Sequence, residues 1–141
     1  MKLPFSLLSS LIFMVLLSCN QQNPKEKLAH LNGYWEISKV EMPDGTVKEY
    51  TISTLVDYIE IKDSVGFRKK VAPKLDGGFI INDDAEKITV KIENNTLNLY
   101  YSTQFDSWKE TVLEANEQQL VVLNKDDKKY TYKKFEKFNL E

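Results

Sequence analysis

Two adjoining segments with strict alternation constrain the fold of this chain more than any other feature. Apolar residues occupy every second position on both sides of a central Asn94-Asn95 pair, namely Ile88, Val90 and Ile92 before it and Leu97, Leu99 and Tyr101 after it. A period of two is typical of a half-buried strand. Asparagine tolerates positive φ, so the pair suits a two-residue type I′ turn. The sequence therefore predicts an antiparallel hairpin that pairs Ile92 with Leu97, Val90 with Leu99 and Ile88 with Tyr101 on one buried face.

Further short strands are predicted at similar spacing, over residues 34–42, 47–52, 57–62, 67–72, 79–81, 108–115, 120–124 and 129–135. Turn signals such as Pro43-Asp44-Gly45 separate them. In the first strand the apolar positions change from odd to even near Ser38-Lys39, which predicts a β-bulge. Helix is expected only as single turns over 25–31 and 53–57. About ten strands joined by short turns predict an all-β, antiparallel up-and-down meander, closed or nearly closed into a barrel of 8–10 strands.

Composition limits the functions that this chain can have. The 141 residues carry 19 Lys+Arg and 21 Asp+Glu, and this near balance argues against a nucleic-acid partner. One cysteine excludes a disulfide framework and a Cys-rich metal site. The one histidine, His30, precedes the first predicted strand, where a catalytic triad or a zinc site would find little support. Acidic turns at 76–78 and 82–84 lack the spacing of a calcium loop. We therefore expect no enzyme, no metal and no cofactor.

The first 18 residues have the order of an export signal. Lys2 is followed by an apolar run over 7–17, which is the length of a secretory h-region and too short for a membrane span. Leu16-Leu17-Ser18-Cys19 resembles a bacterial lipobox, although a smaller residue than Leu17 is usual. The resemblance implies that residues 1–18 are a cleaved lipoprotein signal peptide and that Cys19 is acylated. An ordinary signal peptide or an uncleaved anchor is the alternative. Asn20 after the cysteine implies the outer membrane, and residues 19–30 suit a short tether.

The segment Leu31-Asn32-Gly33-Tyr34-Trp35 resembles the opening of lipocalin-like domains, in which Gly-x-Trp begins the first strand. Over about 31–137 the chain is similar to small lipocalin-like lipoproteins of diderm bacteria, which are lipid-anchored calycin-type barrels. The resemblance implies a barrel domain over residues 31–138, with Gly33 and Trp35 as its fold motif. The usual mid-chain Thr-Asp-Tyr pattern is missing. The only arginine is Arg68, so Lys133 or Lys134 would replace the arginine that packs across the first-strand Trp.

Inside such a barrel we expect Trp35 to close one end, and the interior beyond it to be either a pocket or a filled core. If Phe67 and Val71 point inward, Lys69 lies inside or at the mouth, where it could pair with an anionic ligand group; alternatively the strand is an edge protected by its charges. Aromatic residues crowd one hairpin connection and are candidate ligand or partner contacts: Tyr100, Tyr101, Phe105 and Trp108. The hairpin register places Tyr100 and Tyr101 on opposite faces.

The sequence thus favours a lipid-anchored envelope protein whose lipocalin-like barrel binds a small hydrophobic or amphipathic molecule. Its expected partners are the membrane, through acylated Cys19, and such a ligand. The alternative is a non-enzymatic interaction or structural lipoprotein with a filled barrel, which docks an envelope protein complex.

Overall fold

The computed structural model describes residues 21–138. The expected signal peptide and Cys19 lie outside the described residues. One helix and ten strands follow in order: α2 (Pro24–Ala29), β1 (Gly33–Glu41), β2 (Val47–Glu49), β3 (Val56–Lys62), β4 (Val65–Pro73), β5 (Phe79–Ile81), β6 (Glu86–Glu93), β7 (Thr96–Ser102), β8 (Ser107–Ala115), β9 (Gln119–Leu123) and β10 (Lys129–Lys134). Among these residues no helix is long and apolar enough to cross a membrane.

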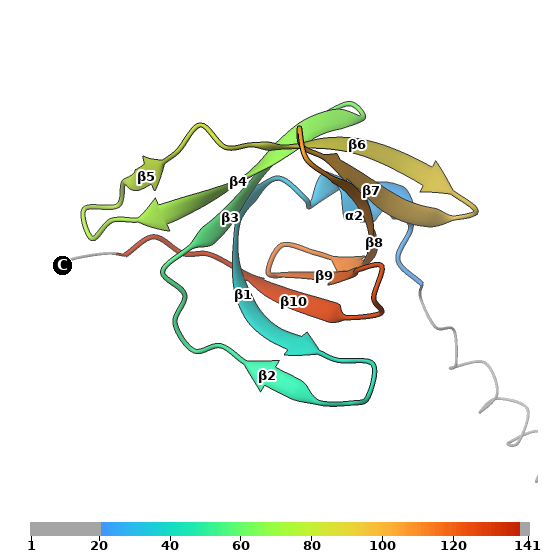
Figure 1. The fold of residues 1–141 in the computed structure, drawn as a ribbon, viewed down its shortest axis with the longest axis horizontal. Helices are drawn as coiled ribbons and strands as arrows, with labels where there is room; N and C mark the ends of the chain where they lie inside the picture. Colours follow the sequence, from blue (N-terminus) through green and yellow to red (C-terminus); the bar gives the residue numbers. More distant parts are fainter. Residues whose placement is uncertain (1–20, 139–141) are drawn as a thin grey trace, which may run out of the picture.

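Eight of the strands form a closed antiparallel barrel. Their order is β10-β9-β8-β7-β6-β4-β3-β1, and pairing of β10 with β1 completes the ring. The two remaining strands lie outside it, as Figure 1 shows: β2 pairs with β1, and β5 pairs with β4. The predicted all-β meander and its closure are confirmed.

The hairpin of β6 and β7 has the predicted register, with Ile92 opposite Leu97, Val90 opposite Leu99 and Ile88 opposite Tyr101. Asn94 and Asn95 have φ of 49° and 60°, as a type I′ turn requires. Ile92, next to this turn, is 46% exposed, whereas its neighbours along the stripe are buried. The stripe therefore reaches the core except at its last residue.

β1 bends at the predicted bulge. Its pairing with β10 shifts register between Ile37 and Lys39. Before the bulge, β1 pairs with β3 on its other edge, and after the bulge it pairs with β2. The expected helical turn over 53–57 is wrong, because Asp57 already belongs to β3 and the Ser53 hydroxyl donates to the Leu55 carbonyl at 2.6 Å in an irregular loop.

The two ends of the barrel differ. We call the end that carries α2 and the β3–β4, β6–β7 and β8–β9 turns the base, and the opposite end the mouth. At the base, α2 begins at Pro24, with Asn23 accepting a hydrogen bond from the Lys25 amide as N-cap. The buried Lys27 ammonium donates to the Val112 carbonyl at 3.3 Å, which ties α2 to β8. The helix covers this end and, in Figure 1, lies within the outline of the sheet.

Trp35 belongs to the core at the base. Its indole Nε1 donates to the Leu31 carbonyl at 2.8 Å. The Lys134 ammonium lies 4.3 Å from the centre of the Trp35 ring and donates to the Asn32 carbonyl at 2.9 Å. Lys134 therefore occupies the place expected of an arginine. Gly33 has φ of +126°, and a Cβ there would meet the end of the Lys134 side chain. Both observations explain why glycine is the first residue of the Gly-x-Trp motif.

The core fills the base half of the barrel. It consists of one cluster of buried residues: Leu31, Trp35, Ile59, Ile61, Ile88, Val90, Leu97, Leu99, Tyr101, Val112, Ala115, Leu120 and Val122. The sequence left open whether the interior is a pocket or a filled core. The base is a filled core, and the open space lies at the mouth.

Candidate functional site

A hollow of about 290 Å³ opens at the mouth, and we call it the interior cup. It lies between β1, β3, β4, β10 and the loop over 50–55. Its apolar and aromatic walls are formed by Trp35, Ile37, Val40, Leu55, Tyr50, Tyr130 and Tyr132. Ser53, Asp57 and Lys70 supply polar groups on the remaining side. This volume is close to the lower end of small-molecule pockets, which span about 300–1,000 Å³, so the cup suits one small ligand.

Asp57 and Lys70 form an ion pair across the β3–β4 ladder. The Lys70 ammonium lies 2.6 Å from Asp57 Oδ1. The two side chains differ in burial, since 6% of the Asp57 side chain is exposed and 59% of the Lys70 side chain. The carboxylate is therefore fixed in the wall of the cup, while the side chain that carries its counter-ion is largely exposed to solvent.

Arg68 lies inside the barrel below the cup. It is opposite Ile59 in the β3–β4 ladder, and Ile59 is a core residue. Its Nε lies 2.5 Å from Glu86 Oε2, and its Nη1 lies 3.5 Å from Glu110 Oε2. The guanidinium carbon is 4.4 Å from the centre of the Tyr101 ring. Residues on four strands thus surround one cation, and we call Asp57, Arg68, Lys70, Glu86 and Glu110 the interior ion network.

Glu110 is the most constrained carboxylate of this network. Burial raises the pKa of Glu110, although Arg68 and a hydrogen bond from Tyr101 act in the opposite direction. Its Oε2 has no hydrogen-bond partner within the described part of the chain. A small cavity of about 10 Å³ adjoins it, between Arg68, Tyr101 and Tyr132. That space is about the size of one water molecule, and Trp35, Asp57 and Tyr132 line both it and the cup.

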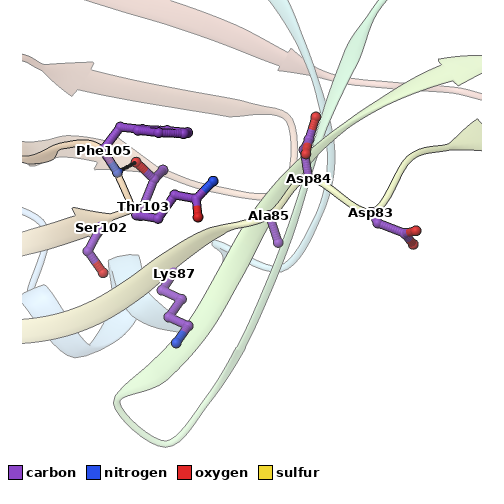
Figure 2. A pocket seen from close by; sticks show the side chains of 8 residues that line it. Asp83, Asp84, Ala85, Lys87, Ser102, Thr103 and Phe105 are labelled. Atoms are coloured by element: carbon purple, nitrogen blue, oxygen red, sulfur yellow. Dashed lines mark hydrogen bonds between the residues drawn. The ribbon is translucent and has the colours of Figure 1, made fainter.

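A second hollow, of about 660 Å³, lies at the rim of the mouth, outside the cup. Figure 2 shows it between the β5–β6 connection, which carries Asp83 and Asp84, and the β7–β8 loop. Phe105 on that loop is 88% exposed. The Thr103 hydroxyl oxygen accepts a hydrogen bond from the Phe105 amide at 3.2 Å, which holds the loop (Figure 2). Its lining side chains are largely exposed, so this hollow has less means than the cup to enclose a ligand.

The four aromatic candidates do not form one surface. Tyr101 is buried, and its ring stacks on Trp108 with centroids 5.3 Å apart. Tyr100 lies on the outer face, where its hydroxyl donates to Glu93 Oε2 at 2.7 Å. Phe105 alone projects from the rim. The separation follows from the hairpin register, because Tyr101 and Trp108 are cross-strand partners on the inner face.

The expected orientation of Lys69 is the reverse of the observed one. Its ammonium lies 5.4 Å from the centre of the Phe67 ring, and its partner in the ladder is Tyr58, whose ring packs against those of Tyr34 and Phe67. The inward positions of β4 belong to Arg68 and Lys70. The alternative of a charged edge strand is also wrong, since β4 pairs with β3 on one side and with β6 and β5 on the other.

Three residues of the interior ion network were not expected at the site from sequence: Asp57, Arg68 and Glu110. The sequence does carry a signal for Arg68, because alternation over 57–62 puts Ile59 and Ile61 on one face and a tight turn after Lys62 puts Arg68 opposite Ile59. Among residues 21–138, no three His, Cys, Asp or Glu side chains come together as metal ligands, and the two acidic turns do not converge.

A closed antiparallel barrel of eight strands, with a packed base and an open cup, defines a class of proteins whose interior is wide enough for one small ligand. The chain belongs to the family of the lipocalin-like domain, whose model matches residues 31–122.

Two solved structures are similar to this chain. A lipocalin-like protein from Bacteroides uniformis ATCC 8492 is 12% identical, with 75% of this chain and 99% of that one covered and a TM-score of 0.48. An uncharacterized protein from Bacteroides eggerthii DSM 20697 is 12% identical, with 74% and 98% covered and a TM-score of 0.46. The sequence matches none of the curated proteins.

Proposed function

We propose that this protein is lipid-anchored in the cell envelope, at the outer membrane as its Asn20 implies, and that its barrel binds one small amphipathic molecule in the interior cup. The observation that carries the binding is the lining of the cup. Four aromatic side chains, Trp35, Tyr50, Tyr130 and Tyr132, face a fixed carboxylate and its counter-ion. Such a site offers a stacking surface and a polar group at fixed positions, which is the usual composition of a small-molecule site.

Attachment to the membrane is proposed from the sequence, through acylation of Cys19 after cleavage behind Ser18. Each buried methylene contributes about 0.8 kcal/mol, so two or more acyl chains would hold the protein firmly. The mass of the purified mature protein should correspond to a chain beginning at an acylated Cys19. A Cys19→Ala variant should lose both the added mass and its recovery in the membrane fraction. Recovery of the wild-type protein without acyl mass would contradict this part of the proposal.

Ligand binding is tested with the intact protein in a non-ionic detergent. Short amphiphiles with eight-carbon chains are titrated by calorimetry, and titration of empty micelles is subtracted. Saturable binding with one molecule per chain is expected. Replacement of Tyr132 by Ala should weaken it, because this ring forms part of the cup wall. Phe105→Ala is the matched control, since this aromatic side chain lies outside the cup and should leave binding unchanged. Absence of saturable binding across amines, acids and alcohols would overturn the proposal.

A further inference from the structure

The cup favours one charge type of ligand, and this inference rests on the proposed function. We propose that its ligand is a small amphipathic organic ammonium, whose cationic group replaces Lys70 at Asp57 while its apolar part lies against the aromatic wall.

The two members of the Asp57–Lys70 pair differ in their freedom to move. The carboxylate is buried in the wall and cannot follow its partner outward, whereas the Lys70 side chain is 59% exposed and can extend fully into water. A buried charge without a partner is costly, so Asp57 requires a cation at all times. A ligand ammonium that enters the cup can take over this position, and Lys70 is then solvated at little cost.

The wall of the cup beside Asp57 is rich in aromatic side chains. Trp35, Tyr50, Tyr130 and Tyr132 line the cup beside Asp57. The faces of aromatic rings attract cations, and the effect grows when the cation is desolvated. The Trp35 and Tyr50 rings each already have a lysine ammonium over one face, from Lys134 at 4.3 Å and Lys48 at 4.9 Å, so the attraction for a ligand cation rests on Tyr130 and Tyr132. A site that combines several ring faces with one buried carboxylate provides the two kinds of contact that an organic ammonium makes. A carboxylate ligand would be repelled by Asp57 and would have to compete with it for Lys70.

The surroundings of the cup carry more negative than positive charge. The interior ion network has three carboxylates and two cations, so displacement of Lys70 leaves Arg68 as the one cation of this network. Glu110 Oε2 is buried 3.5 Å from Arg68 Nη1 and makes no hydrogen bond among the described residues. The connections at the mouth carry seven aspartates and three lysines, which are Asp44, Asp76, Asp83, Asp84, Asp106, Asp126 and Asp127 with Lys74, Lys125 and Lys128. An acidic opening attracts cations and repels anions.

The test compares three ligands of equal chain length, octylamine, octanoate and octan-1-ol, titrated into the intact protein in non-ionic detergent. Octylamine should bind on the order of tenfold more tightly than either of the others, the difference expected for one charge-assisted contact. Tighter binding of octanoate or octan-1-ol, or equal binding of all three, overturns this inference and leaves the proposed function standing. Absence of binding by all three overturns both.

Two variants locate the effect. Asp57→Asn should remove the preference for octylamine, while Asp63→Asn, which changes an exposed carboxylate in the β3–β4 turn at the base, should keep it. Lys70→Ala removes the internal competitor, so octylamine should bind more tightly; Lys91→Ala, with the same change of charge outside the barrel beside Tyr100, should have no effect. Should Asp57→Asn fail to fold, the wild-type comparison and Lys70→Ala still decide. Weaker octylamine binding by Lys70→Ala would overturn the inference.

Discussion

Arg68 brings together three strands that are distant in the sequence. Its guanidinium contacts Glu86 on β6 and Glu110 on β8 from its own position on β4. Removing one member of such a buried group leaves an uncompensated charge, whereas a neutral replacement of the same shape costs less. At the scale of single residues, the interior ion network therefore makes stability depend on protonation.

Glu110→Gln should change the pH dependence of stability. The pKa of Glu110 is raised in the folded protein, mainly by burial. Between its ordinary pKa and its folded pKa, the native state binds more protons than the unfolded state, so the free energy of unfolding of the wild type falls as pH rises. Glu110→Gln has no ionisable group at this position, so its free energy of unfolding does not fall with pH for this reason. Its free energy of unfolding relative to wild type, from urea titrations between about pH 4 and pH 8, should therefore increase with pH. A constant or decreasing difference would contradict this.

Gly66→Ala should be among the most damaging single changes. A Cβ at Gly66 would lie 2.7 Å from Ile61 Cα and would overlap the Glu60 carbonyl oxygen, and these backbone atoms cannot move aside as a side chain can. A loss of about 2–3 kcal/mol is expected from such overpacking, measured by denaturant unfolding. Gly78→Ala is the control, since its neighbours are flexible side chains. Equal stability of the two variants would refute the explanation.

Secondary-structure elements were largely predictable from the sequence, and their orientation was less so. Alternation placed β6 and β7 in register because each is half buried and their turn is marked by two asparagines. β4 was misread because Phe67 and Val71 are apolar yet lie on the outer face. Val71 is buried there between its ladder partners Val56 of β3 and Ile81 of β5. A strand with apolar residues on both faces gives no periodic signal of which face is inside.

The β6–β7 turn offers a test at this scale. Asn95 has φ of 60°, which glycine and asparagine adopt and β-branched residues avoid. Asn95→Gly should keep the stability of the wild type, and Asn95→Val should lower it by about 1–2 kcal/mol. The midpoints of urea unfolding rank the three proteins. If Asn95→Val unfolds at the wild-type midpoint, the turn does not determine the hairpin.

The whole molecule is divided between a rigid ring and two appended strands. β2 and β5 have three residues each and pair with one barrel strand only, and most of their residues are exposed. The β3–β4 hairpin brings Asp57 close to Arg68 and Lys70, but β6 and β7 separate Arg68 from Glu110 in the sheet. The full set of charges could not be predicted from the sequence, because these two residues meet only when the sheet curls into a barrel.

Amide hydrogen exchange should show this division. The amides of β2 and β5 should exchange through local openings that cost far less than global unfolding, because few buried contacts hold these strands. Those of β7, whose Leu97 and Leu99 are fully buried, should exchange only through global unfolding. Exchange followed residue by residue with NMR makes the comparison. Equal protection of β5 and β7 would show that the molecule opens as one unit.

The first described residues join the barrel at its base. Gln22 hydrogen-bonds to Ala115 through its side-chain amide, at the base end of β8. An attachment ahead of Gln22, such as the acylated Cys19 proposed above or a chemical linker to a sensor chip, would join the barrel at its base. The mouth would then be the end of the barrel opposite the support, where a ligand could enter and leave without steric hindrance from it.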